Sequence, residues 1–323
     1  DDMFITATST INFASLTLAG PDVRFSLAGG IGVGGDLTIS DSLFIQATST
    51  RQTISGTLTI DDGVMQHLQN TSTTEYKLDF VAENIVIEPG GHVRANNEGS
   101  PGGEIGEDGS GYGGGDADTN GPVGAGASNA GMGGFSSSGN FGGFPSCTFG
   151  FAGELGPIHG GSGGGGSQTS TGGDGGGFVR LEANNTLTIN GSITAEADPE
   201  FGGGERAGEG DTINGTPEST ITARGGNSFD SNGGGGGGGC VRIRYSTTST
   251  IDGSDIIVDG GVGFENGGAG VVLVEKSDES VRKVYLTATT TPAYGVDQNY
   301  TVADTRFIDG TDDITSLSIS TSS

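Results

Sequence analysis

Short runs in which apolar residues alternate with Ser or Thr recur along the first 95 residues. The runs occupy residues 11–18, 22–27, 36–39, 42–45, 56–60 and 84–87. A period of two is typical of a strand that buries one face, and turn-forming residues separate the runs. The runs are shorter than two helical turns, and each glycine inside a helix costs about 1 kcal/mol. The pattern therefore predicts an all-β fold.

A weak internal repeat links the two halves of the chain. Residues 84–95 resemble residues 185–195 and, more loosely, residues 249–258; each copy has a strand, a glycine-marked corner and a second strand. Three further apolar runs begin at Phe178, Cys240 and Val271, which are 62 and 31 residues apart. This spacing predicts a unit of 31 residues with a degenerate copy near residues 219–223.

The repeated strands predict a parallel β-helix with long glycine-rich insertions, because a solenoid allows an insertion to leave one corner and return without disturbing the stack. We expect coils in 1–95 and 178–276, a glycine-rich insertion in 96–177, and a β cap or assembly segment in 277–323. A β-sandwich is the alternative. Residues 96–177 and 198–239 would, however, be very long hairpin loops in a sandwich.

Glycine supplies 67 of the 323 residues, without the strict three-residue period of collagen. The long glycine runs have two structural interpretations, and the sequence does not choose between them. They are flexible linkers, or they are ordered segments that pack as a platform over one face, since glycine permits close backbone approach. Isolated aromatic residues favour the platform: Phe135, Phe141, Phe144, Phe149 and Phe151.

The chain is strongly acidic, with 40 Asp and Glu residues against 13 Lys and Arg residues and a formal net charge of −27. This charge repels phosphate backbones and anionic membranes, so nucleic acid is excluded as a partner. No stretch approaches the roughly 20 apolar residues that span a bilayer, so we expect no membrane insertion. The acidity suits a solvated surface on a cell exterior or cation binding.

One segment resembles the opening of a calcium loop. Asp116, Asp118 and Asn120 supply oxygens at positions 1, 3 and 5, and Gly121 stands at position 6. Position 12 is Ala127, where such loops carry a bidentate Glu. These three residues are the candidate metal ligands, with calcium as the possible ion.

Two covalent modifications are also candidates in a secreted chain. Cys147 and Cys240 are the two cysteines; they form a disulfide in an oxidising compartment or are inert packing residues. Five asparagines begin Asn-x-Ser/Thr sequons and are candidate glycosylation sites: Asn70, Asn184, Asn190, Asn214 and Asn299.

The sequence specifies no active site. The adjacent acids Asp61 and Asp62 precede Gly63, where a β-turn is required, so we interpret them as turn residues rather than as a catalytic pair. We expect the chain not to be an enzyme, and polysaccharide degradation is the least favoured function.

Apolar-alternating segments close to both ends suggest self-assembly. They contain Phe4 and Ile5 near the start, and Ile314, Leu317 and Ile319 near the end. A solenoid exposes an unpaired strand edge unless it is capped. These segments close their own subunit, or they add as strands to the next copy and give an open filament.

The stacked Leu-Thr-Ile and Gly-Ser-Ile strands with glycine-rich insertions resemble bacterial and archaeal β-helix surface proteins, a broad class of adhesins and filament components. The likeness covers residues 11–95 and 178–275. It implies secretion to the cell surface or beyond, a passive scaffold, and contacts with other copies or with surface glycans. We therefore expect a self-assembling extracellular structural protein, with a cell-surface adhesin or carbohydrate-binding module as the alternative.

Overall fold

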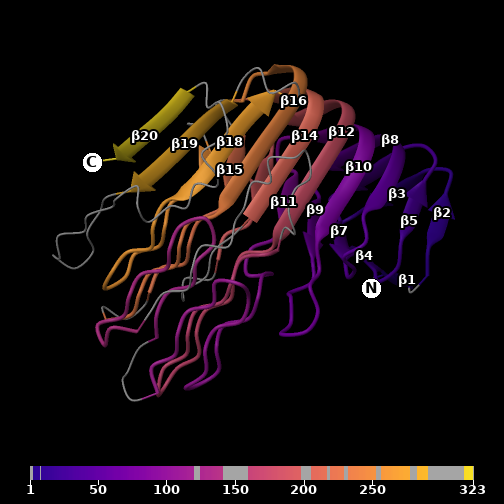
Figure 1. The fold of residues 1–323 in the computed structure, drawn as a ribbon. Coiled ribbons are helices and arrows are strands. Elements are labelled where there is room, and N and C mark those ends of the chain that lie inside the picture. Colours follow the sequence, from indigo (N-terminus) through magenta and orange to yellow (C-terminus); the bar gives the residue numbers. More distant parts are fainter. Residues whose placement is uncertain are drawn as a thin grey trace.

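The computed structural model describes residues 3–7, 9–119, 124–140, 159–197, 205–216, 219–228, 232–251, 256–276, 282–289 and 316–322. Every regular element in these ranges is a β-strand, so the all-β prediction is confirmed. The strands form two sheets, one of eight strands and one of twelve. They follow one another from β2 at one end to β20 at the other (Figure 1).

The smaller sheet has the strand order β1-β4-β7-β9-β11-β13-β15-β17. Its strands are β1 (Met3–Ala7), β4 (Val23–Leu27), β7 (Leu43–Gln46), β9 (Val64–His67), β11 (His92–Arg94), β13 (Ser192–Thr194), β15 (Thr220–Thr222) and β17 (Ile256–Ile257).

The larger sheet has the order β2-β5-β8-β10-β12-β14-β16-β18-β19-β20, with β3 and β6 beside β8. Its strands are β2 (Ile11–Phe13), β3 (Leu16–Ala19), β5 (Ile31–Val33), β6 (Leu37–Ser40), β8 (Gln52–Asp61), β10 (Leu78–Ile87), β12 (Phe178–Ile189), β14 (Glu205–Gly215), β16 (Cys240–Ser249), β18 (Gly270–Lys276), β19 (Arg282–Thr289) and β20 (Ser316–Ser322).

From β7 to β18 the chain alternates strictly between the two sheets, and each strand pairs in parallel with the equivalent strand of the next passage. Among the described strands, the pairing of β18 with β19 is the antiparallel exception. Such long parallel stacks are consistent with a β-solenoid. They are not the hairpin-linked antiparallel sheets that a β-sandwich requires.

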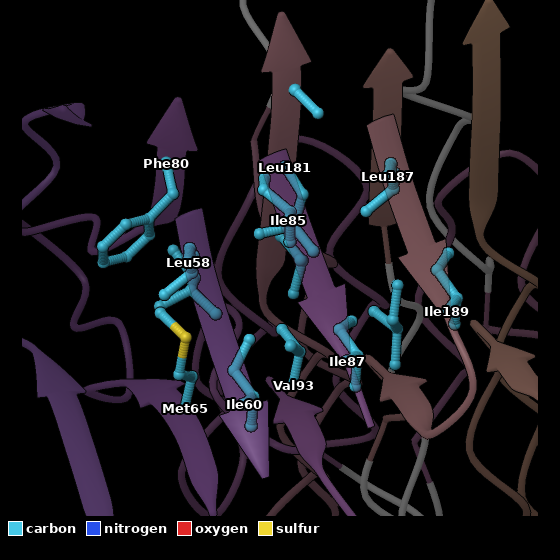
Figure 2. Close-up of a cluster of buried hydrophobic side chains, with 14 of the residues drawn as sticks. Leu58, Ile60, Met65, Phe80, Ile85, Ile87, Val93, Leu181, Leu187 and Ile189 are labelled. Carbon is cyan, nitrogen blue, oxygen red and sulfur yellow. The ribbon is translucent and has the colours of Figure 1, made fainter. Parts of the chain in front are cut away.

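Identical register along the stack places aliphatic side chains above one another. Leu58, Ile85, Leu187 and Ile213 are partners in successive strands of the larger sheet, and all four are fully buried. Figure 2 shows several of these side chains between the two sheets, facing Met65 and Val93 of the smaller sheet. The ladder removes apolar surface from water along the length of the molecule, which is the main source of its stability.

Aromatic rings stack in the same way near the N-terminal end. The rings of Phe25 and Phe44 lie 5.4 Å apart between centroids in a stacked arrangement, and the ring of Phe80 meets that of Phe44 edge-on at 5.6 Å. All three are fully buried. Aromatic pairs prefer both geometries, so the orientations of these three buried rings are fixed relative to one another.

Residues at the corners between the two sheets adopt the left-handed backbone conformation. Gly20, Asp41, Asp62 and Gly90 have φ values of 116°, 47°, 50° and 88°. Each lies between a strand of the larger sheet and the next strand of the smaller one. Asp and Gly tolerate this conformation better than other residues. Asp62 is therefore a turn residue, as interpreted, whereas Asp61 is the last residue of β8.

The predicted unit of 31 residues is wrong. In the register, Phe178 pairs with Glu205, Glu205 with Cys240, and Cys240 with Val271, so the spacings are 27, 35 and 31 residues. The missing copy is β14, a glycine-rich and charged strand without an apolar run. Residues 219–223 contain β15 instead, which belongs to the smaller sheet.

Residues 95–177 leave the stack after β11 and return at β12 without breaking it, since β11 pairs with β13 and β10 with β12. In Figure 1 the glycine-rich segments extend from one side of the sheets as closely spaced traces. At the C-terminal end, β19 reverses direction and β20 runs parallel to it, which extends the larger sheet.

We predict that Ile85→Ala lowers the free energy of unfolding by about 2–5 kcal/mol, because it leaves a cavity in the middle of the ladder. Urea denaturation followed by circular dichroism measures this change. Val86→Ala is the matched control on the same strand, since Val86 is half-exposed, and we expect a loss of about 1 kcal/mol or less. Equal losses for the two variants would contradict the placement of Ile85 in the buried stack of aliphatic side chains.

Candidate functional site

The glycine-rich segments form an ordered bundle beside the sheets. We use the name glycine bundle for residues 99–119, 124–134, 160–177, 223–228, 233–239 and 258–270. Residues 160–166 and 233–239 run through its interior and are almost wholly buried. Ala125 and Ala127 are also fully buried. The described glycine segments are therefore packed elements, which supports the platform reading over the linker reading.

Residues 233–239 contact a different neighbour with each successive N–H group. The donor–acceptor pairs are Gly234 and Gly237 to segment 124–127, Gly235 and Gly238 to segment 265–268, and Gly236 and Gly239 to segment 223–226. The partner repeats every third residue. A backbone with three residues per turn and no internal hydrogen bonds is of the polyproline II type, which points successive amides about 120° apart.

Residues 160–167 repeat this arrangement in the other half of the bundle. Gly161 and Gly164 donate to segment 173–176, Gly163 and Gly166 to segment 107–110, and Gly165 to Ala125. Their carbonyl groups accept with the same period, from Ser100, Gly103 and Gly106 in turn. Each interior segment thus lies among several neighbours and satisfies its backbone groups without a sheet.

At several of these positions only glycine fits. A Cβ atom on Gly163 would lie closer than 3.0 Å to the carbonyl oxygen of Pro101, and one on Gly235 equally close to that of Gly261. Real Cβ atoms do not approach so near. The composition of the insertion is therefore set by the contact distance between backbones.

A polar junction holds the base of the bundle against the loop that precedes β10. Glu75 accepts a hydrogen bond from the Gly160 amide at 2.9 Å and contacts His159 Nδ1 at 3.0 Å. Lys77 Nζ lies 3.3 Å from the same carboxylate. The His159 ring lies against the ring of Tyr112, with centroids 4.2 Å apart.

A second carboxylate joins the bundle to the strand connection after β9. Asp174 accepts from the Gly102 amide at 2.9 Å and also from the Gln69 side chain. The Asn70 amide donates to the carbonyl oxygen of Glu98 at 3.1 Å. These bonds fix the orientation of the bundle relative to the sheets.

His67 is a fully buried member of this junction. Its Nδ1 donates to the Leu68 carbonyl oxygen at 2.7 Å, and its Nε2 accepts from the Phe178 amide at 3.0 Å. Burial lowers the pKa of His67 from 6.5 to about 4, opposed by the Leu68 hydrogen bond. The imidazole is therefore neutral at pH 7 and acts as a structural link between β9 and β12.

Glu98 shows the opposite shift. Burial raises its pKa from 4.5 to about 7, the nearby Arg94 lowers it and Asp174 raises it further. A carboxyl group with such a pKa can move protons near neutral pH. We assign Glu98 no chemistry.

Two of the three predicted calcium ligands, Asp116 and Asp118, lie in the glycine bundle. Asp116 is exposed and Asp118 is buried, and the Asp118 amide donates to the Gly166 carbonyl oxygen at 3.0 Å. Asn120 lies outside the described residues. In the described ranges, no group of three or more His, Cys, Asp and Glu side chains could hold a metal ion. Calcium at these residues stays a prediction.

The predicted modification sites are in different environments. Cys240 is disulfide-bonded and buried at the start of β16, while Cys147 lies outside the described residues. Asn184 is exposed, and Asn190 and Asn214 are half-buried. Asn70 is 4% exposed and its side chain accepts from the Tyr76 amide, so the folded chain does not present it to solvent. Asn299 lies outside the described residues.

The predicted assembly residues lie on strands at sheet ends. Phe4 and Ile5 belong to β1, which pairs with β4 alone. Leu317 and Ile319 belong to β20, which pairs with β19 alone. Ile314 lies outside the described residues. The structure thus places these four residues at opposite ends of the stack but does not bring them together.

A cleft of about 400 Å³ opens between the corners after β14 and β16. It is lined by Gly215, Thr216, Ser219, Ile221, Thr250, Ile251 and Ile256. Hydroxyl groups here bond to the protein itself: Thr250 accepts from the Gly215 amide, and Ser219 donates to the Thr216 carbonyl oxygen. The cleft carries no charged side chain in the ranges described.

The sequence did not predict the polar junction. It also did not predict that successive amides of an interior glycine segment bond to three different neighbouring segments. Glu75, His159 and Asp174 are far apart in the chain, and no motif connects them. One feature of the sequence did point to an ordered bundle. The glycine runs lie directly beside the predicted strands, so little chain is left between them to act as a flexible tether.

We predict that Gly163→Ala lowers the free energy of unfolding by about 1–3 kcal/mol and weakens amide protection in residues 160–167, because the methyl group forces two backbones apart. Hydrogen exchange with mass spectrometry measures the protection. Gly34→Ala is the control, since a Cβ there meets nothing nearer than 3.7 Å. Unprotected amides in 160–167 of the native chain would instead favour the linker reading.

We predict opposite pH effects for the two shifted groups. Because the pKa of His67 is lower in the folded chain, the unfolded chain binds its proton first as the pH falls below 6.5. The stabilisation is complete above pH 6.5 and is lost towards pH 4, by about 3 kcal/mol. The raised pKa of Glu98 has the reverse effect, so stability rises as the pH falls from about 7 to 4.5.

Urea titrations at pH values from 8 to 4 separate the contributions of His67 and Glu98 to stability. They are carried out on the native chain, His67→Gln and Glu98→Gln. Relative to the native chain, His67→Gln should lose less stability on acidification, and Glu98→Gln should lose more. Parallel pH profiles for all three proteins would show that neither group is shifted.

No helix in the ranges described is long and apolar enough to cross a membrane. Comparison with protein-family models, with curated proteins and with solved structures found no match to this chain.

Proposed function

We propose that this protein is an extracellular structural protein whose copies join end to end, by strand addition, into a filament or matrix. The observation that carries the proposal is the pair of open ends on the larger sheet. β2 and β3 at one end, and β20 at the other, each pair with a single strand of the described chain. Among the described strands, no second strand pairs with them, and an open strand edge is a ready route to assembly.

The direction of the strands favours a head-to-tail joint. β19 runs antiparallel to β18, and β20 runs parallel to β19, so β20 is antiparallel to β2. An added copy would therefore pair antiparallel at the joint, and antiparallel ladders are slightly more stable per residue than parallel ones. Because the two edges differ, the contact is heterologous and generates an open chain of copies rather than a closed pair.

Three further features suit this function. We propose that the two parallel sheets close into a parallel β-helix, whose continuous core would give a stiff rod. The disulfide at Cys240 supports an oxidising, extracellular location. The formal charge of −27 keeps rods soluble and separates them laterally, so that contact is directed to the ends. The proposal assigns the chain no catalytic activity and no nucleic-acid partner.

We predict that the purified native chain forms filaments in electron micrographs and that Ser318→Lys with Ser320→Lys prevents them, because lysines on an edge strand block pairing. Both substitutions lie on β20. Asn184→Lys with Thr186→Lys is the matched control, with the same charges and spacing on the interior strand β12, and it should still form filaments.

Sedimentation velocity and thermal melting accompany the images, so that a loss of filaments is not confused with unfolding. Repeating the images with a calcium chelator tests whether calcium contributes to the joints. Dispersed single rods of the native chain in every condition would overturn the proposal.

A further inference from the structure

Threonine side chains form two columns on the outer face of the larger sheet. One column crosses the strands β8, β10, β12, β14 and β16, which follow one another in Figure 1. The other crosses β3, β6, β8, β10, β12 and β14. We call the two columns the threonine array. In order of pairing, the first column is Thr57, Asn84, Thr186, Thr212 and Thr248, and the second is Thr17, Thr38, Thr59, Val86, Thr188 and Asn214.

The threonine array faces away from the core. From β8 to β14 its positions alternate with fully buried aliphatic residues, as Thr57 and Thr59 do with Leu58. Every position in the array is half-exposed or exposed. In the ranges described, no hydrogen bond joins a threonine hydroxyl of the array to another residue. The hydroxyl and methyl groups are therefore presented to whatever lies outside the sheet.

The parallel register gives the array a regular spacing in two directions. Neighbouring strands of a sheet lie about 4.8 Å apart, and positions two residues apart along a parallel strand are separated by about 6.6 Å. Because threonine is branched at Cβ, its rotation about χ1 is restricted and its hydroxyl and methyl groups are held in place. The two spacings are close to the repeats of the water oxygen atoms on the prism faces of hexagonal ice.

The array is uncharged in a strongly acidic chain. Charged residues make up 16% of the sequence, but none stands in either column. A hydroxyl group both donates and accepts hydrogen bonds, as a water molecule of a lattice does, and the adjoining methyl group favours the release of disordered water. The array has no aromatic side chain to stack on a sugar ring and little apolar surface to bury against a second copy. A neutral lattice of water suits it better than either.

We infer that the threonine array binds the surface of ice, with its hydroxyl and methyl groups holding an ordered layer of water that joins the crystal lattice. This activity does not rest on end-to-end assembly. The array lies on the face of the larger sheet, whereas the open strands β2 and β20 lie at the two ends of that sheet.

The test is partition of the full chain into ice that grows slowly through a stirred solution, together with thermal hysteresis measured by nanolitre osmometry. We expect the native chain to enter the ice, while an unrelated acidic protein of similar size stays in the liquid. Thr59→Lys with Thr188→Lys should lower the partition by about tenfold or more, because two lysine side chains hold the lattice away from the array.

Thr194→Lys with Thr220→Lys is the matched control. It adds the same charges at solvent-facing threonines of the smaller sheet and should partition as the native chain does. Asn84→Thr with Asn214→Thr makes the columns more uniform and should raise the partition; threonine is favoured in strands, so the fold is kept. Thermal melting of every variant accompanies the measurements.

Exclusion of the native chain from ice, without thermal hysteresis, overturns the inference. So does a folded Thr59→Lys, Thr188→Lys variant that still enters the ice, or a control variant that is excluded equally. If that array variant does not fold, Asn84→Thr with Asn214→Thr decides, and the absence of a gain overturns the inference. Ser318→Lys with Ser320→Lys should lose filaments but keep ice binding, so failure of assembly and failure of ice binding are distinguished.

Discussion

The structure depends on one constraint, which is that each buried backbone N–H and C=O group needs a partner. Two arrangements satisfy it here. In the sheets, strands pair with the equivalent strand of the next passage, as Ile85 does with Leu58 and Leu187. In the glycine bundle, the amides of Gly234, Gly235 and Gly236 turn to three different segments. The first arrangement leaves room for side chains on both faces; the second leaves room for only a few small ones, such as those of Ala125 and Ser162.

This difference explains where large side chains occur. Strands in a sheet are separated by a distance that allows aliphatic residues to project into the core, and these side chains supply the hydrophobic stabilisation. Segments in the bundle approach until a Cβ atom would overlap a neighbouring carbonyl group, as at Gly163. The bundle therefore gains its stability from hydrogen bonds and close backbone contact, and from its attachments at Glu75 and Gln69 to the loop between β9 and β10.

The period-two pattern was sufficient to predict the strands that bury aliphatic residues. Ile85, Ile87, Leu187 and Ile189 face the core as expected. It failed at β14, where residues 205–215 contain four charged residues and three glycines but no apolar run; the parallel ladders with β12 and β16 define that strand instead. Backbone pairing with neighbours overrode local preference there. The junction was unpredictable for another reason, since Glu75 and His159 meet only because the bundle folds back to its base.

An ordered bundle built from glycine has a consequence for function. Most positions in its interior segments are glycine, so the large side chains of the bundle lie at turns between segments. Ile105 occupies such a turn, closed by the Glu107 amide donating to the Glu104 carbonyl oxygen with Gly106 at φ of 73°. Tyr112 occupies the next one, beside Gly111. The many hydrogen bonds of the bundle hold both turns in place, and preorganisation of this kind reduces the entropic cost of binding. The hydrogen-bonded glycine-rich segments therefore hold the side chains of Ile105 and Tyr112 in fixed positions.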